Sequence, residues 1–455
     1  MINLAATLKN RKLGDLRSSR NVYRREPGCF FDGMDLLLFN ILSRLPVKCL
    51  MKCKSVCRFW RYLIKHNTCF IDLHLTMSKN HLLDEHTFLM YPTCHVNRPI
   101  PIKRFLFCPK DLRVDDCHGH ESLDASAIVT SNNVSLDEKP VTMLEPVNGL
   151  VCFVKGGSAV MEHCSVLIYN PSTRYKTPWI DTLTNAAFRK LFGVKLVKGC
   201  RRDRLKSSYE YMFGFGVDPV TNKHKVFCII EITVTRRIEE IVNRELVCGV
   251  FTVGENTWRK IEEVPPETTI KKNSFHVCGS IYWISGKKPR CENGVIMAFD
   301  LGSETFRSIT IPNPVLDHWG SIERLQFVHE LAEVDGHLCV LVREGDDILN
   351  LWIHTIDNGG SVNNKNWTEE TLQLPCRWDK IHNLAFKAIT GTSLVVLKFL
   401  KEERYAHQFR CEVLQYYDRS EKKFYKNSFE ILLDPTGTPG NTYSITPFFE
   451  TLLPV

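Results

Sequence analysis

Three cysteines in the N-terminal part of the chain have a spacing that could support metal chemistry. Cys49, Cys53 and Cys57 recur every four residues, so a helix through this segment would place their thiols near one face. Structural zinc sites favour closer cysteine pairs and four ligands. We therefore interpret the three as small apolar side chains of a helix packing face, and we predict no metal here.

A second cluster, Asp115–His120 (DDCHGH), gathers an aspartate pair, a cysteine and two histidines in one expected loop. These residue types could hold zinc. The sequence shows no distant partner for them, so we interpret the cluster as a polar surface loop.

A basic segment precedes an apolar run that contains the letters FGFG. Aromatic side chains, on which nucleic-acid bases stack, fall outside this segment, so nucleic acid is an unlikely partner. We interpret it as a solvated loop, with a site for an acidic stretch of a substrate as the alternative. Its basic residues are Lys195, Lys198, Arg201, Arg202, Arg204 and Lys206.

Familiar catalytic motifs are absent from the sequence. The nearest approach to a phosphate-binding loop, Gly279 with Gly286–Lys287, has the wrong spacing and no Ser or Thr after the lysine. Neither a G-x-S-x-G elbow nor an H-E-x-x-H helix occurs. We predict no catalytic residue, no metal site and no cofactor.

The composition describes a soluble protein of several domains. The 455 residues are 44% hydrophobic and 24% charged, and the net charge of +8 is modest. Eighteen cysteines without a visible signal peptide, many of them in apolar runs, favour a reducing compartment, the cytoplasm and/or the nucleus. No apolar run approaches the ~18 residues that would cross a membrane, so no membrane partner is predicted.

The elements that would position functional residues change in kind along the chain. Residues 1–30 are basic and lack an apolar period, which indicates a disordered tail or, alternatively, a nuclear-import or organelle-targeting segment. Residues 31–76 show helical periodicity that is interrupted at Pro46, as expected of a helical hairpin. A segment this small would usually need a partner to bury its apolar surface.

From residue 144 to about 432 the pattern is that of strands and tight turns. An apolar strand, then Asp or Asn, then a polar turn and an aromatic residue recur along the chain, and glycines mark further hairpins. The expected turn anchors are Asn170, Asp218, Gly254, Asp300, Asp357 and Asp418. Repeats of roughly 40–50 residues predict a propeller-like array, with a pair of β-sandwiches as the structural alternative.

Two flanking regions complete the predicted organisation. Residues 77–143 are expected to be a connecting region with the first strands, and residues 433–455 a C-terminal tail or edge strand.

These segments resemble a known family. Residues 34–75, including NILSRLPVKCL, SVCRFWRYLI and FIDLHL, resemble the plant F-box, and NGLVCF, YNPSTRYKTPW, FGFGVDPVTNKHKVFCI, GSIYWIS and DGHLCVLVRE resemble the F-box-associated, kelch-like domain of plant F-box proteins. The resemblance implies an α+β multidomain chain, with a small all-α F-box domain followed by a large all-β, propeller-like domain. The usual Leu-Pro opening of the motif aligns with Gly33–Met34, and Cys49 stands where Ser is common.

The resemblance also implies a function. F-box proteins are substrate-recognition subunits of Skp–cullin–F-box (SCF) ubiquitin ligases: the F-box binds a Skp-type adaptor, through it the cullin, and the downstream domain binds a target protein. By position, the residues implied for adaptor binding or for packing the small domain are Leu37, Leu38, Ile41, Leu42, Leu45, Pro46, Val47, Leu50, Val56, Cys57 and Trp60.

Two rival functions remain open from the sequence. One is a β-propeller enzyme with an incidental helical head, which would need convergent acids or metal ligands at the propeller mouth. The other is an interaction scaffold that does not work in a ligase. For the ligase function, Pro46→Ala, or Leu42→Ala with Leu45→Ala, is expected to cost on the order of 2 kcal/mol of adaptor binding.

Overall fold

The computed structural model divides into two compact units, Met1–Met77 and Ser78–Val455, which are described separately. The residues that the structure describes are 35–81, 86–92, 100–107, 128–134, 141–156, 164–182, 205–236, 240–255, 257–266, 274–285, 295–320, 331–345, 347–355, 366–374, 381–389, 391–401, 411–432 and 443–455.

The first unit is a small helical domain. Its helices are α2 (Asp35–Leu42), α3 (Val47–Cys53), α4 (Arg58–His66) and the first part of α5 (Thr68–His81). Proline at position 46 ends the first helical segment and caps α3, with its carbonyl accepting from Leu50 N at 3.1 Å. The core of the unit is apolar and includes Leu42, Val47, Leu50, Leu63, Ile64, Phe70 and Ile71.

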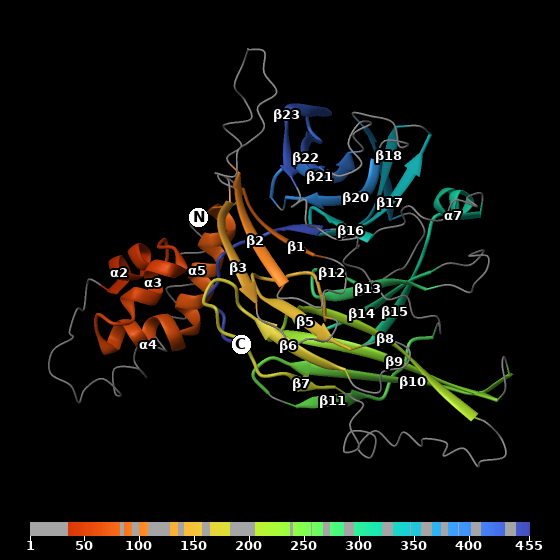
Figure 1. The fold of residues 1–455 in the computed structure, drawn as a ribbon, viewed down its shortest axis with the longest axis horizontal. Coiled ribbons are helices and arrows are strands. Elements are labelled where there is room, and N and C mark those ends of the chain that lie inside the picture. The colour runs from red at the N-terminus through yellow and green to blue at the C-terminus, as the bar shows by residue number, and fades with distance from the viewer. Residues whose placement is uncertain are drawn as a thin grey trace. The chain divides into compact units, whose positions relative to one another are not determined.

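The described part of the second unit contains six four-stranded antiparallel sheets, which Figure 1 shows in sequence from orange to blue. We number these sheets as blades. Blade 1 is β24 (Tyr443–Pro447), β1 (His86–Pro92), β2 (Ile100–Phe107) and β3 (Ile128–Val134); blade 2 is β4 (Val141–Met143), β5 (Val151–Lys155), β6 (Ser165–Tyr169) and β7 (Ile180–Asp181); blade 3 is β8 (Leu205–Val217), β9 (His224–Arg236), β10 (Glu240–Thr252) and β11 (Trp258–Ile261).

The other three sheets follow the same order of strands. Blade 4 is β12 (Phe275–Val277), β13 (Ser280–Ser285), β14 (Val295–Asp300) and β15 (Phe306–Thr310); blade 5 is β16 (Leu331–Val334), β17 (His337–Glu344), β18 (Ile348–His354) and β19 (Trp367–Gln373); blade 6 is β20 (Ile381–Ala388), β21 (Leu394–Lys401), β22 (Cys411–Asp418) and β23 (Lys423–Leu432). A short helix, α7 (Asn313–Gly320), follows blade 4.

The six sheets close into a ring. An apolar cluster fills each junction from blade 1 through to blade 6, so each sheet packs on the next. The last junction, between blades 6 and 1, contains an edge-on contact between Phe88 and Tyr416 with ring centroids 6.4 Å apart. The prediction of a helical domain followed by a propeller is confirmed, and the sheets are not paired as sandwiches.

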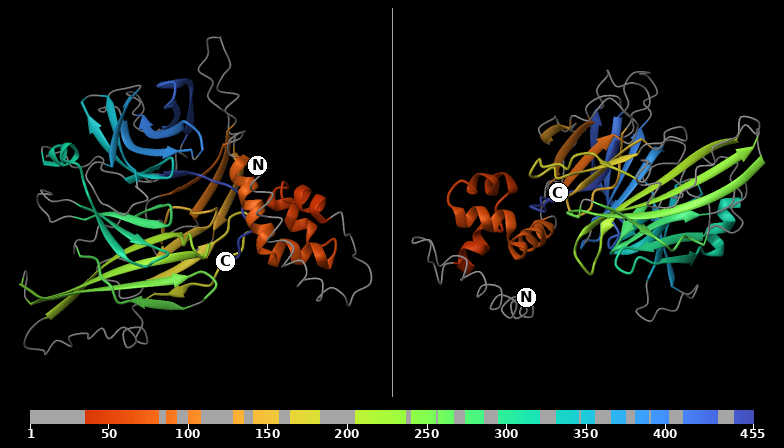
Figure 2. Two further views of the ribbon diagram at one scale, coloured as in Figure 1. Left: turned by 180° about the vertical axis from the view of Figure 1, so that it is seen from behind. Right: turned by 90° about the horizontal axis from the view of Figure 1, so that it is seen from below.

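Blade 1 joins the two ends of the second unit. Its inner strand, β24, comes from the C-terminal end of the chain and pairs antiparallel with β1, with Phe88 opposite Pro447 and Pro92 opposite Tyr443. In Figure 2 the blue C-terminal segment accordingly reaches the orange strands. The three long strands of blade 3, β8, β9 and β10, extend beyond the strands of the other blades in Figure 1, because each has 13 residues.

The predicted turn anchors Asn170, Asp218, Asp300 and Asp418 share one geometry. In each turn the anchor's Oδ1 accepts hydrogen bonds from the backbone N–H groups two and three residues later. The residue four positions after the anchor has a positive φ, between 52° and 63°. Gly254 lies in a turn at φ 93° but has no side chain to accept such bonds, and position 357 lies outside the described residues.

All these anchored turns lie at one end of the blades. They join the third and fourth strands in blades 2, 4 and 6, and the first and second strands in blade 3. Because the strands of an antiparallel sheet alternate in direction, both kinds of turn lie at the same end of a blade. We call this end of the ring the turn face.

Candidate functional site

The helical unit divides the predicted adaptor-binding residues into two groups. Leu37 is 58% exposed, Ile41 is 52% exposed and Val56 is 64% exposed, and Pro46 is also exposed. Leu42, Val47 and Leu50 are buried in the core of the unit. Leu38, Leu45, Cys57 and Trp60 are partly buried. The first group can contact another protein directly, whereas the buried group holds the helices in place.

The helix period explains this division on α2. Leu37 and Ile41 are four residues apart and therefore lie on one face of the helix, which points to solvent. Phe39 lies edge-on against Phe70 of α5, with ring centroids 5.6 Å apart. That contact orients α2 so that its other apolar face is covered.

Two polar contacts fix the corners between the helices. The buried ring of His74 on α5 has its Nε2 atom 3.1 Å from the carbonyl oxygen of Leu45, just before Pro46. Cys57 is the N-cap of α4, and its Sγ accepts from Trp60 N at 3.4 Å. The Cys57 thiol is therefore a capping group of the kind that Ser usually supplies.

Tyr62 is an exposed residue that the sequence reasoning missed. It lies on α4, is 41% exposed, and precedes the buried pair Leu63–Ile64. Its position could have been recognised in the sequence, because Tyr62 is a large aromatic residue on the polar side of an amphipathic helix.

Metal binding has no support in the described part of the chain. No group of three or more His, Cys, Asp or Glu residues there is arranged to hold a metal ion. The cluster at 115–120 and residues 195–204 of the basic segment lie outside the described residues.

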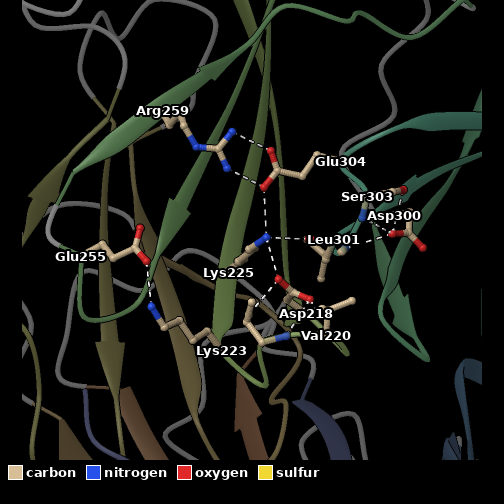
Figure 3. Close-up of polar contacts among 12 residues, drawn as sticks. Asp218, Val220, Lys223, Lys225, Glu255, Arg259, Asp300, Leu301, Ser303 and Glu304 are labelled. Carbon is tan, nitrogen blue, oxygen red and sulfur yellow. Dashed lines mark hydrogen bonds and ion pairs between the residues drawn. The ribbon is translucent and has the colours of Figure 1, made fainter.

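A polar cluster of the propeller lies on the turn face, between blades 3 and 4 (Figure 3). The Nζ atom of Lys225 lies 2.9 Å from Asp218 Oδ2 and 3.0 Å from Glu304 Oε1, and it donates to the carbonyl oxygen of Leu301 at 2.6 Å. Arg259 donates two further hydrogen bonds to the Glu304 carboxylate, at 2.5 and 2.6 Å. The cluster thus joins Asp218, Lys225 and Arg259 of blade 3 to Glu304 of blade 4.

The charges in this cluster compensate one another. Burial by itself would raise the pKa of Asp218, but hydrogen bonds from Lys225 and Thr221 and from the turn N–H groups outweigh it and lower that pKa to about 2. The pKa of Glu304 is likewise lowered by Arg259 and Lys225 despite burial. Both acids are therefore ionised at neutral pH and paired, which suits a clamp between blades rather than proton transfer.

A second ion pair lies where three non-adjacent blades approach one another. Lys387 of β20 pairs with Glu145, which follows β4, and its Nζ lies 4.8 Å from the centroid of the Phe275 ring of β12. Burial and the neighbouring Glu145 raise the pKa of Glu333 on β16. A propeller enzyme would carry its acids where the blades approach one another in this way, and here Lys387 neutralises one acid, Glu145.

Two known protein families match this chain. One family model, the F-box domain, matches residues 35–72, which include all the residues proposed for adaptor binding. Another, the F-box associated beta propeller domain, matches residues 115–449, well over half of the chain. This chain belongs to the plant F-box proteins that carry an F-box-associated β-propeller.

Several relatives match this F-box protein over most of its length. It is 24% identical to F-box protein At1g30790 of Arabidopsis thaliana, over 79% of this chain and 81% of that protein. It is 25% identical to F-box protein At4g19940 of the same plant, over 70% of each chain. An F-box followed by this kind of propeller supports a general role in substrate recognition by SCF ligases, with Skp-type adaptors as the general kind of partner.

Proposed function

We propose that this F-box protein is a non-catalytic substrate-recognition subunit of an SCF ubiquitin ligase. Its helical unit binds a Skp-type adaptor and, through the adaptor, a cullin, while its propeller binds the protein to be ubiquitinated. Holding the target beside a ubiquitin-loaded enzyme raises the effective concentration of the two reactants. In this role the protein therefore needs no catalytic residues of its own.

The observation that carries the proposal is the concentration of exposed apolar side chains on the helical unit. Seven large hydrophobic residues are exposed in the described part of the chain, and four of them are Leu37, Ile41, Val56 and Tyr62. Apolar groups gathered in this way are typical of a protein-binding surface. Anchors spaced one helical turn apart, as Leu37 and Ile41 are, suit insertion into a groove of a partner.

A double substitution on this surface tests adaptor binding. Leu37→Asp with Ile41→Asp is expected to weaken binding of a purified Skp-type adaptor by at least about 30-fold, equivalent to on the order of 2 kcal/mol. Both side chains are exposed, so the helical unit should still fold, as circular dichroism can verify. Binding is measured by isothermal titration calorimetry with the full chain.

The propeller offers a matched control for this experiment. Val220, 81% exposed, and Val264 are apolar surface residues outside the helical unit. Val220→Asp with Val264→Asp adds the same charge and is expected to leave adaptor affinity unchanged. Wild-type affinity in the helical variant would refute the adaptor assignment. If the protein bound the adaptor but no ubiquitin were transferred to the proteins that bind its propeller, the alternative of an interaction scaffold that does not work in a ligase would be favoured instead.

We propose the cytoplasm and/or the nucleus as the location of this protein. The described cysteines whose side chains are placed are free thiols, several of them buried, as suits a reducing compartment. Within the described residues, no helix is both long enough and apolar enough to span a bilayer.

A further inference from the structure

The last eight residues of the chain, Phe448–Val455, follow the closing strand β24 and pack on the propeller. We call this segment the C-terminal strap. Phe448 and Thr451 are fully buried, and Leu452 is almost so. Phe448 belongs to the apolar cluster between blades 1 and 2, and Leu453 and Val455 pack against the cluster between blades 2 and 3. The strap therefore crosses blade 2 on the turn face.

One side chain of blade 2 binds the strap through its amide. Asn170 Nδ2 donates hydrogen bonds to the carbonyl oxygens of Thr451 at 3.1 Å and of Leu453 at 2.9 Å. In return, Thr451 N donates to Ser172 Oγ at 3.1 Å. Asn170 is completely buried, so these bonds are made away from solvent.

The same asparagine also anchors its own turn. Its Oδ1 accepts from Ser172 N at 2.9 Å and from Thr173 N at 3.1 Å, which leaves only the amide nitrogen available to the strap. Asp218, Asp300 and Asp418 anchor their turns in the same way through Oδ1. The amide is needed at position 170 because a carboxylate there would face two carbonyl oxygens without a proton to donate.

The backbone of blade 2 is also shaped for the strap. Gly149 lies in the turn between β4 and β5 with φ 77°. A Cβ atom at this position would lie 2.6 Å from the carbonyl oxygen of Phe449 and 2.8 Å from Thr451 Cγ2. Only glycine combines this backbone conformation with so close an approach of the strap.

We propose that the C-terminal strap is a latch that keeps the propeller closed, and that blade 2 forms a peptide-binding site for the strap. The site is occupied by the chain's own segment Phe448–Val455. Asn170 binds two of its carbonyl oxygens, and Ser172 binds one of its N–H groups. The apolar side chains of the strap pack on the blades. The latch secures β24 against β1, the pairing through which the two ends of the propeller meet. This inference is independent of adaptor binding by the helical unit.

An isosteric exchange tests the latch in the full-length chain. Asn170→Asp keeps the Oδ1 acceptor for the turn but removes the donor to the strap. We expect hydrogen exchange at the amides of Thr451 and Leu453 to accelerate by about tenfold or more, because the strap opens locally. Carboxypeptidase should then remove residues of the strap that it leaves intact in the wild-type protein.

Asp418→Asn is the matched control. It makes the reverse exchange at the same position of an equivalent turn, where no strap lies, so exchange in residues 448–455 should stay at the wild-type rate. If the strap amides of Asn170→Asp exchanged at the wild-type rate, the proposal would be overturned. It would also be overturned if the strap amides of both variants lost the same amount of protection from hydrogen exchange.

A milder variant decides the matter if Asn170→Asp does not fold. Ser172→Ala removes the acceptor for Thr451 N and leaves the turn's own N–H bonds intact. We expect faster exchange at Thr451 in this variant, with exchange in the core strands unchanged. Wild-type exchange at Thr451 in folded Ser172→Ala would count against the latch.

Discussion

Lys225→Met is expected to lower the free energy of unfolding of the propeller by about 3–5 kcal/mol, the usual cost of leaving a buried charge without its partner. The Lys225 side chain is only 8% exposed and supplies the ammonium group for both Asp218 and Glu304. In this variant Glu304 would still be paired with Arg259, but the Asp218 carboxylate would lie against the apolar methionine side chain. Urea unfolding monitored by tryptophan fluorescence, with the full chain, measures the change.

A neighbouring lysine provides the control. Lys223 pairs with Glu255 at 2.8 Å, but both side chains are about half exposed, so Lys223→Met should cost less than about 1 kcal/mol. Adding Asp218→Asn to Lys225→Met should restore part of the lost stability, because it removes the unpaired charge. Equal effects of the two lysine substitutions would show that the cluster in Figure 3 does not clamp blades 3 and 4.

Acidification from pH 7 to pH 5 is expected to destabilise the propeller by about 2 kcal/mol for each of two histidines, the buried His224 and the partly buried His276. Burial lowers the pKa of His224 and of His276 from 6.5 to about 4. His224 Nε2 lies 3.1 Å from the carbonyl oxygen of Val147 in blade 2, and His276 Nε2 accepts from Val217 N of blade 3. Both rings therefore bridge blades in their neutral form.

The direction of the effect follows from proton uptake. Between pH 6.5 and 4 the unfolded chain binds protons at these histidines and the folded chain does not, so stability is complete above pH 6.5 and falls as the pH falls toward 4. Asp218, with its pKa lowered to about 2, contributes its own loss only below pH 3.8. The raised pKa of Glu333 acts in the opposite direction and offsets part of the loss.

Glutamine substitutions separate the histidines from other acidic groups. A glutamine can place a donor or an acceptor near the Nε2 position but does not titrate. In His224→Gln with His276→Gln, the unfolding temperature should depend much less on pH between 6.5 and 4.5 than in the wild-type protein. An unchanged dependence would mean that other groups control acid stability.

The local parts of the propeller could be predicted from the sequence because they depend on short-range chemistry. Asn170, Asp218, Asp300 and Asp418 were expected at turns, and each side chain does hold its turn. Their irregular spacing has two causes. Asp218 marks the turn between first and second strands rather than third and fourth, and the three long strands of blade 3 have 13 residues each.

The ring closure could not be predicted in the same way. Blade 1 combines β24 with β1, strands that lie at opposite ends of the propeller sequence, and no local pattern joins them. Likewise, the cluster around Lys225 draws its acids from positions 218 and 304. Contacts of this kind depend on how the sheets pack, which the strand pattern does not specify.

The candidate adaptor surface was predicted as a set of positions but not as a surface. Leu37, Leu38, Ile41 and Leu42 fit one apolar helical pattern, yet two of them face solvent and Leu42 is buried. Contacts from α5, through Phe70 to Phe39 and through His74 to the Leu45 carbonyl, decide which side is covered. Those contacts join helices that are about 30 residues apart in the chain.

Closure by β24 has a consequence for biosynthesis. About 370 residues separate Met77, the end of the helical unit, from Pro447, the end of the closing strand. At about 5–20 residues per second, a ribosome needs on the order of 20–80 s to make them. For most of that interval the helical unit of the nascent chain has left the ribosome while the ring still lacks its final strand.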